Sequence, residues 1–243
     1  MNTDCLMVLR NQLPFSRGDL RFAMSTESHA CSEALANKTL NYLLKEELIA
    51  RIGRNMYKVI DQERRIYSYE YSEFAENIAA TINEAHPALE FTILELMQLN
   101  AFVNHLFGKN TIFVYVESDI EDYVFDTLKD RYPGKVLLSP SIEEYDRYAD
   151  DDTIVICKLI SEAPKGKMKS WNTRLEKFLV DLMSESLLQE IISPGEYPRI
   201  YEEAFSRYEI DESCMFRYAR RRNAEGRIRD FIRDETNISL RTE

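Results

Sequence analysis

The segment 48–59 is the feature that most restricts how this chain can fold. Polar and apolar side chains alternate over residues 49–53 and again over 56–59, and Arg54 and Asn55 stand between the two stretches. Asparagine enters the left-handed backbone region at modest cost, so these two residues can form the tip of a tight turn. The sequence therefore predicts a basic β-hairpin, and it follows directly on an amphipathic helical pattern.

Three short helices are expected before the hairpin. The first is predicted over 3–12 and the second over 17–24, each opened by a capping hydroxyl, Thr3 and Ser16. The third ends near residue 47 and carries a stripe of apolar side chains at helical spacing. This stripe consists of Ala36, Leu40, Leu43 and Leu44. Helices followed by a basic hairpin predict a winged helix-turn-helix over residues 1–60, in which the third helix enters the major groove of DNA.

The third helix and the hairpin carry the side chains expected to contact DNA. Lysine, asparagine and tyrosine can donate hydrogen bonds to base edges, and hairpin cations can contact phosphates. The predicted DNA-binding residues are Lys38, Asn41, Tyr42 and Lys45 on the helix, and Arg51, Arg54 and Lys58 on the hairpin. A second hypothesis is that the same domain is an adaptor that docks a protein and does not bind DNA.

Charge is divided unevenly along the chain. The net charge is −11, whereas residues 1–58 carry eight basic and six acidic residues, a net of +2, which leaves −13 on the remainder. An acidic protein does not coat nucleic acid nonspecifically. A slightly basic module on an acidic body is typical of a protein that touches DNA with one end only.

Composition also bounds the compartment and the cofactors. The four cysteines and three histidines are scattered without paired spacing, which favours reduced thiols and predicts neither a metal site nor a cofactor. No apolar run approaches the roughly 18–20 residues of a membrane span, and the N-terminus does not resemble a signal peptide. A cytoplasmic protein without a membrane partner is expected.

The remaining chain is expected to form two further parts. Residues 61–160 alternate predicted helices and strands, as in an α/β domain with a small mixed or parallel sheet. Residues 161–243 are predicted to be helical and packed on that domain, with one helix opened by a capping box from Thr173 to Glu176. The fold class is thus α+β. The helices of the middle part are predicted over 73–84, 93–107, 119–131 and 141–148, and its strands over 111–116, 135–138 and 153–157.

Acidic side chains in these two parts do not predict an active site. Glu176 is assigned to the capping box, and Asp181 to the polar side of its helix. A metal-dependent nuclease needs an Asp on one strand and Glu-x-Lys on the next. In the nearest candidates, two residues instead of one separate the glutamate from the lysine. A nuclease is therefore only the third hypothesis, and no catalytic residue is predicted. These candidates are Asp151 or Asp152, Glu162 and Lys165.

Arginines are concentrated over residues 217–233, and acidic residues interleave them. Pairing between residues four apart on a helix accounts for part of this pattern. A second basic patch for nucleic acid, formed by Arg217, Arg220 and Arg221, is the alternative.

Three segments carry a family resemblance. They are LLKEELIARIGRNMY at 43–57, RLEKFLVDL at 174–182 and MFRYARRR at 215–222. The chain resembles the antitoxin component of abortive-infection E (AbiE) toxin–antitoxin systems, with Asn55 in place of the family's usual glycine. Residues 61–160 match only in the order of their elements. The resemblance implies that the N-terminal domain represses its own operon by binding operator repeats, and that the C-terminal domain opposes a separately encoded nucleotidyltransferase toxin without requiring a stable complex.

The leading hypothesis is therefore a cytoplasmic bacterial regulator that binds double-stranded DNA, the autorepressing antitoxin of a two-gene module. A single winged helix reads about half of a binding site, which favours a homodimer or cooperative binding.

Overall fold

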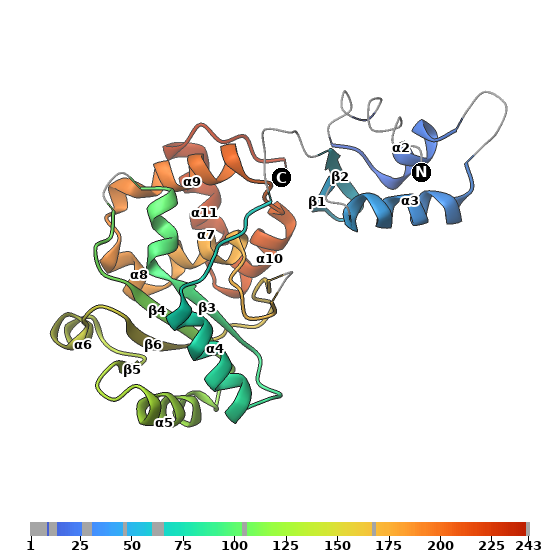
Figure 1. Ribbon diagram of the computed structural model, residues 1–243. Coiled ribbons are helices and arrows are strands. Elements are labelled where there is room, and N and C mark those ends of the chain that lie inside the picture. Colours follow the sequence, from blue (N-terminus) through green and yellow to red (C-terminus); the bar gives the residue numbers. More distant parts are fainter. Residues whose placement is uncertain are drawn as a thin grey trace.

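The computed structural model of the chain describes residues 9, 14–25, 31–45, 48–59, 66–103, 106–166 and 169–241. These residues form helices and two small sheets, so the protein is of mixed α and β class. A two-stranded sheet lies near the N-terminus and a four-stranded sheet lies in the body of the molecule (Figure 1). None of the helices in these ranges combines the length and apolar character that a bilayer crossing requires.

The N-terminal part contains α2 (Arg17–Ala23), α3 (Glu33–Lys45) and the antiparallel strands β1 (Ile49–Gly53) and β2 (Met56–Val59). Ser16 caps α2 as predicted, because its hydroxyl accepts the Asp19 N–H while the Asp19 carboxylate accepts the Ser16 N–H. The hairpin is also confirmed. Asn55 at its tip has a φ of 58°, in the left-handed region that asparagine tolerates. The predicted helix over 3–12 lies outside the described residues apart from Leu9, which is helical and buried.

Phe15 ties α2 to the hairpin. Its backbone N–H donates to the Tyr57 carbonyl over 2.9 Å and its carbonyl accepts the Tyr57 N–H over 2.8 Å. The two rings lie 5.9 Å apart within a small apolar core. This N-terminal core is formed by Leu9, Phe15, Leu20, Leu40, Leu43, Ile49, Tyr57 and Val59.

The sheet of the body has the strand order β3-β4-β6-β5. Strands β4 (Thr111–Val116), β6 (Thr153–Lys158) and β5 (Val136–Leu138) are parallel, and β3 (Phe91–Glu95) pairs with β4 in the antiparallel direction. The three strands predicted for this region are thus confirmed. So are three of its helices, namely α4 (Glu73–Ala85), α5 (Glu121–Arg131) and α6 (Ile142–Tyr148).

The helix predicted over 93–107 is wrong. Residues 91–95 form β3, and the chain continues as a short 3₁₀ helix, η1 (Leu96–Ala101). All five residues of β3 are buried, and Ile93 lies opposite Val114 of β4. A strand buried on both faces shows a continuous apolar run without alternation, which periodicity alone does not distinguish from a buried helix.

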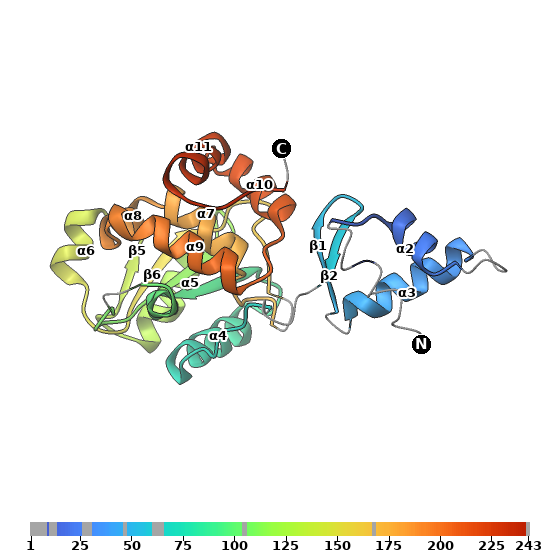
Figure 2. The same ribbon diagram turned by 90° about the horizontal axis from the view of Figure 1, so that it is seen from above.

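The sheet is covered by helices on both faces. Alternate side chains of β4 point to opposite sides, so Ile112 and Val114 join the core under α4 and α5. Phe113 and Tyr115 join the core formed with the C-terminal helices, which therefore share a core with residues 61–160 (Figures 1 and 2). These helices are α7 (Leu175–Ser184), α8 (Ser186–Ile191), α9 (Tyr197–Arg207), α10 (Glu212–Arg221) and α11 (Glu225–Glu235), with a 3₁₀ turn η2 (Pro194–Glu196).

The capping box predicted at Thr173 is wrong as well. Arg174 is the N-cap of α7 and makes no side-chain cap. The Thr173 hydroxyl instead donates to the carbonyl of Ile93 over 2.7 Å and thereby holds the start of α7 against β3. Asp211 is the N-cap of α10, and its carboxylate accepts the Cys214 N–H over 2.9 Å.

Candidate nucleic-acid interface

One face of α3 presents polar side chains to solvent. Lys38, Asn41 and Lys45 are exposed and lie three and four residues apart, which places them on one side of the helix. Tyr42 is half-buried and packs against the N-terminal core, so only part of its surface is available. The structure therefore brings three of the four predicted side chains of α3 onto one open surface.

Two exposed arginines of α2 lie beside α3, and the sequence interpretation missed them. Arg17 and Arg21 are exposed one helical turn apart and line a hollow of about 330 Å³ together with Glu33 and Ala36 of α3 and Asn55 of the hairpin. The Asn55 side-chain oxygen accepts the Arg17 N–H over 3.3 Å, which joins the hairpin tip to the start of α2. The spacing of two arginines four apart on the exposed side of a short helix was the available sequence cue.

The three hairpin cations have different environments. Arg54 at the tip is exposed, and Arg51 is exposed while its Nε donates to the Gly53 carbonyl over 3.2 Å. Lys58 is only 7% exposed, and its Nζ lies 3.3 Å from Glu209 Oε1 in the connection between α9 and α10. The position of Lys58 is at odds with the predicted phosphate contact, because its charge is neutralised inside the protein.

The cations of the N-terminal part differ from those of the C-terminal helices in their pairing. Among the described residues, no acidic group forms an ion pair with the exposed cations of α2, α3 and the hairpin tip. By contrast, Glu162 pairs with both Arg217 and Arg221, over 3.3 and 2.5 Å, and Arg220 pairs with Glu225 over 3.1 Å. The predicted second basic patch is therefore largely neutralised by its own neighbours. The unpaired set is Arg17, Arg21, Lys38, Lys45 and Arg54.

A buried ionic cluster lies under α7 and α10. Asp181 is fully buried, not on a polar helix side as predicted, and it accepts from Lys177 Nζ over 2.5 Å and from the Tyr218 hydroxyl over 2.8 Å. The Lys177 ammonium also lies 3.3 Å from the centre of the Tyr115 ring. Burial lowers the pKa of Lys177, with the Asp181 carboxylate opposing that shift. Because both partners are closed to solvent, this cluster holds the helices together and offers no access to a substrate.

The acidic residues considered for catalysis are not brought together. Asp152 lies just before β6 and Glu162 lies beyond its other end, so the length of the strand separates them. Glu176 is buried and accepts from Arg174 over 2.8 Å and from the Asp211 N–H over 2.9 Å. Within the described ranges, no group of three or more His, Cys, Asp or Glu side chains is placed to hold a metal ion.

Comparison with known proteins assigns the family. Residues 35–238 match the model of a family described as "Family of unknown function (DUF6577)". The chain belongs to this family. A search of curated proteins gives no match. The matched span runs from α3 through the hairpin and the body into the C-terminal tail, so hairpin and body lie within one family region.

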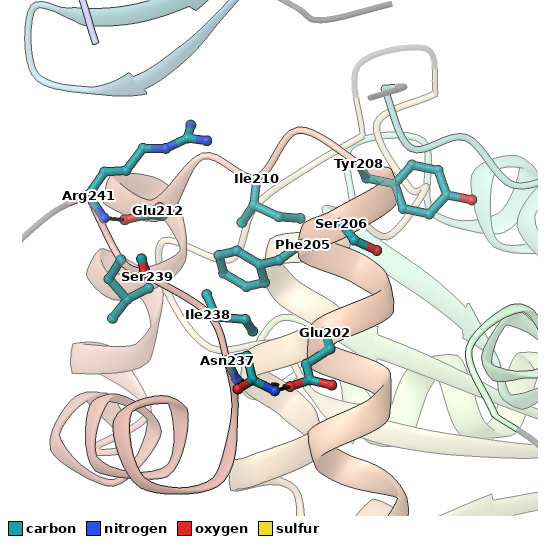
Figure 3. Close-up of a pocket in the computed structure, with 11 residues that line it drawn as sticks. Glu202, Phe205, Ser206, Tyr208, Ile210, Glu212, Asn237, Ile238, Ser239 and Arg241 are labelled. Carbon is teal, nitrogen blue, oxygen red and sulfur yellow. Dashed lines mark hydrogen bonds between the residues drawn. The ribbon is translucent and has the colours of Figure 1, made fainter. Parts of the chain in front are cut away.

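A further hollow lies in the C-terminal part of the chain. This open pocket of about 560 Å³ lies between α9 and the C-terminal tail, with Phe205, Ile210 and Ile238 on its walls (Figure 3). The carboxylate of Glu202 accepts from the Asn237 side chain over 2.8 Å, and that of Glu212 accepts the Arg241 N–H over 2.8 Å. Both acidic groups of the cavity therefore fasten the tail to the helices.

Proposed function

We propose that this protein is a DNA-binding transcriptional regulator whose N-terminal part is a winged helix-turn-helix. The order of α2, α3 and the hairpin supports this proposal, as does the pairing of Phe15 with β2. The observation that carries it is the concentration of exposed, unpaired cations on one small part of an acidic protein. Cations without acidic partners are free to exchange their counterions for phosphates.

The proposal assigns a role to each side chain. Lys38, Asn41 and Lys45 of α3 would face base edges in the major groove, with Tyr42 at the margin. Arg17, Arg21 and Arg54 would bind phosphates on either side of that helix, with Arg51 beside them.

The antitoxin role rests on the resemblance to AbiE antitoxins. On that basis the DNA is the operator of the protein's own operon, bound by a homodimer or by cooperating copies. The opposing partner is a nucleotidyltransferase toxin encoded beside it. Two of the segments that carry the resemblance meet in the buried cluster, where the Tyr218 hydroxyl donates to Asp181.

The proposal is tested by replacing one residue of each element, Lys38→Ala/Arg54→Ala. Loss of a base contact and a phosphate contact should weaken binding to DNA upstream of the gene by roughly tenfold to a hundredfold. The slope of log affinity against log salt should fall by about 0.9 for each lost phosphate contact. Band shifts at several salt concentrations measure both quantities.

The matched control is Lys109→Ala/Lys129→Ala, which removes two exposed charges from the body and should leave binding unchanged. Equal binding by the test and control variants would remove α3 and the hairpin tip from the interface. Absence of any salt-dependent DNA affinity in the wild type would favour the protein-docking adaptor. The observation that favours this second candidate is that the hairpin already packs on a protein surface, that of α10.

A further inference from the structure

The hairpin is seated on the C-terminal part of the protein. Strand β1 lies beside α10 (Figure 2), and a Cβ built on Gly53 would lie 3.1 Å from the Ser213 hydroxyl. Beside this contact, Lys58 of β2 pairs with Glu209, whose side chain is 2% exposed. One face of the hairpin is therefore covered, while its tip remains open.

The covered contact contains a carboxylate that is incompletely satisfied. Glu209 Oε1 accepts from Lys58, but its second oxygen, Oε2, is buried without a hydrogen-bond partner among the described residues. Removing a carboxylate from water costs free energy, which is recovered only when both oxygens are well bonded. A cavity of about 190 Å³ adjoins the pair and is lined by Pro14, Ile52, Lys58 and Arg241. A poorly satisfied, imperfectly packed contact is one that can open at modest cost.

The contact also places negative charge beside the proposed DNA-binding surface. Asp211, at the start of α10, interacts electrostatically with Arg51 of β1, and Glu209 neutralises Lys58. A phosphate approaching this face of the hairpin would meet carboxylates at close range, where like charges repel. Opening would separate the hairpin from these carboxylates and uncover Lys58.

We propose that this contact is an autoinhibitory latch, in which Glu209 and the α10 surface withhold Lys58 and the strand face of the hairpin from DNA. The proposal rests on the proposed DNA-binding function and adds its regulation. In the closed form, the protein engages DNA through α2, α3 and the hairpin tip. In the open form, Lys58 joins them as a further phosphate contact.

A disulfide across the contact tests the latch directly. The separation between position 53 and Ser213 is compatible with a disulfide in Gly53→Cys/Ser213→Cys. The oxidised protein should bind operator DNA at least about fivefold more weakly than the reduced protein, a coupling within the usual range for linked sites. Gly53→Cys alone is the control, because it keeps the native cysteines and lacks the bridge.

A second variant opens the latch without a cross-link. Glu209→Gln removes the carboxylate and should raise DNA affinity, with a salt slope steeper by about 0.9 because Lys58 becomes a phosphate contact. The matched control is Glu203→Gln, which removes an acid of α9 that pairs with Arg207 away from the hairpin.

The outcomes separate the two proposals. Equal binding by the oxidised and reduced double-cysteine proteins would overturn the latch and leave DNA binding intact. Failure of the disulfide to form would show that hairpin and α10 do not meet, and would also overturn it. Absence of DNA binding by wild type and by every variant would overturn the proposed function, and the latch with it.

Discussion

Replacement of Asp181 by alanine is expected to lower the free energy of unfolding by about 3–5 kcal/mol, the usual cost of breaking a buried ion pair. The carboxylate bonds to Lys177 and to the Tyr218 hydroxyl, and it lies 3.7 Å from Arg222 Nε. Its loss leaves the Lys177 ammonium fully buried without a counter-charge. Urea denaturation followed by the fluorescence of Trp171, the single tryptophan, measures the change.

Two further variants show whether the effect arises from the buried charge. Asp234→Ala removes an exposed acid that pairs with Arg233, and such surface pairs contribute about 0–1 kcal/mol. Lys177→Met/Asp181→Leu removes the pair as a whole and should recover most of the loss, because apolar residues can replace a buried ion pair. An Asp181→Ala protein as stable as the wild type would contradict the burial of this cluster.

The elements that could be predicted from the sequence are those set by local chemistry. Ser16, Ser141 and Asp211 each cap the helix that follows, and a cap needs only its own turn of backbone. The hairpin tip at Asn55 depends on the tolerance of one residue for a positive φ. The exposed face of α3 follows from the spacing of its apolar stripe, so Lys38, Asn41 and Lys45 could be placed before the structure.

The features that could not be predicted depend on partners distant in the sequence. Ile93 lies in a strand because β4 lies beside it. The Thr173 hydroxyl does not cap α7 because it donates to the Ile93 carbonyl instead. Asp181 is buried by α10, which supplies Tyr218. Lys58 and Glu209 are 151 residues apart, so nothing near Lys58 in the sequence indicates that its ammonium pairs with a buried carboxylate.

Replacement of Phe15 by alanine is expected to abolish DNA binding while the body stays folded. Phe15 is 1% exposed and joins α2 to β2 through its backbone and its ring. A Phe→Ala change in a core costs about 3–5 kcal/mol, and a part of this size has little stability to lose. The N-terminal part should therefore melt, and α2, α3 and the hairpin would no longer be held together.

Band shifts report the loss of binding, and the Trp171 unfolding transition reports whether the body is intact. Phe22→Ala is the matched control, because Phe22 lies on the same helix α2 but is 80% exposed, and its removal opens no cavity. The two phenylalanines thus separate the loss of an aromatic side chain from the loss of the core. A Phe15→Ala protein that shifts DNA as the wild type does would contradict the dependence of this surface on the N-terminal core. Simultaneous loss of the Trp171 transition would show that the two parts unfold as one unit, in which case the contact between the hairpin and α10 is stronger than an openable latch allows.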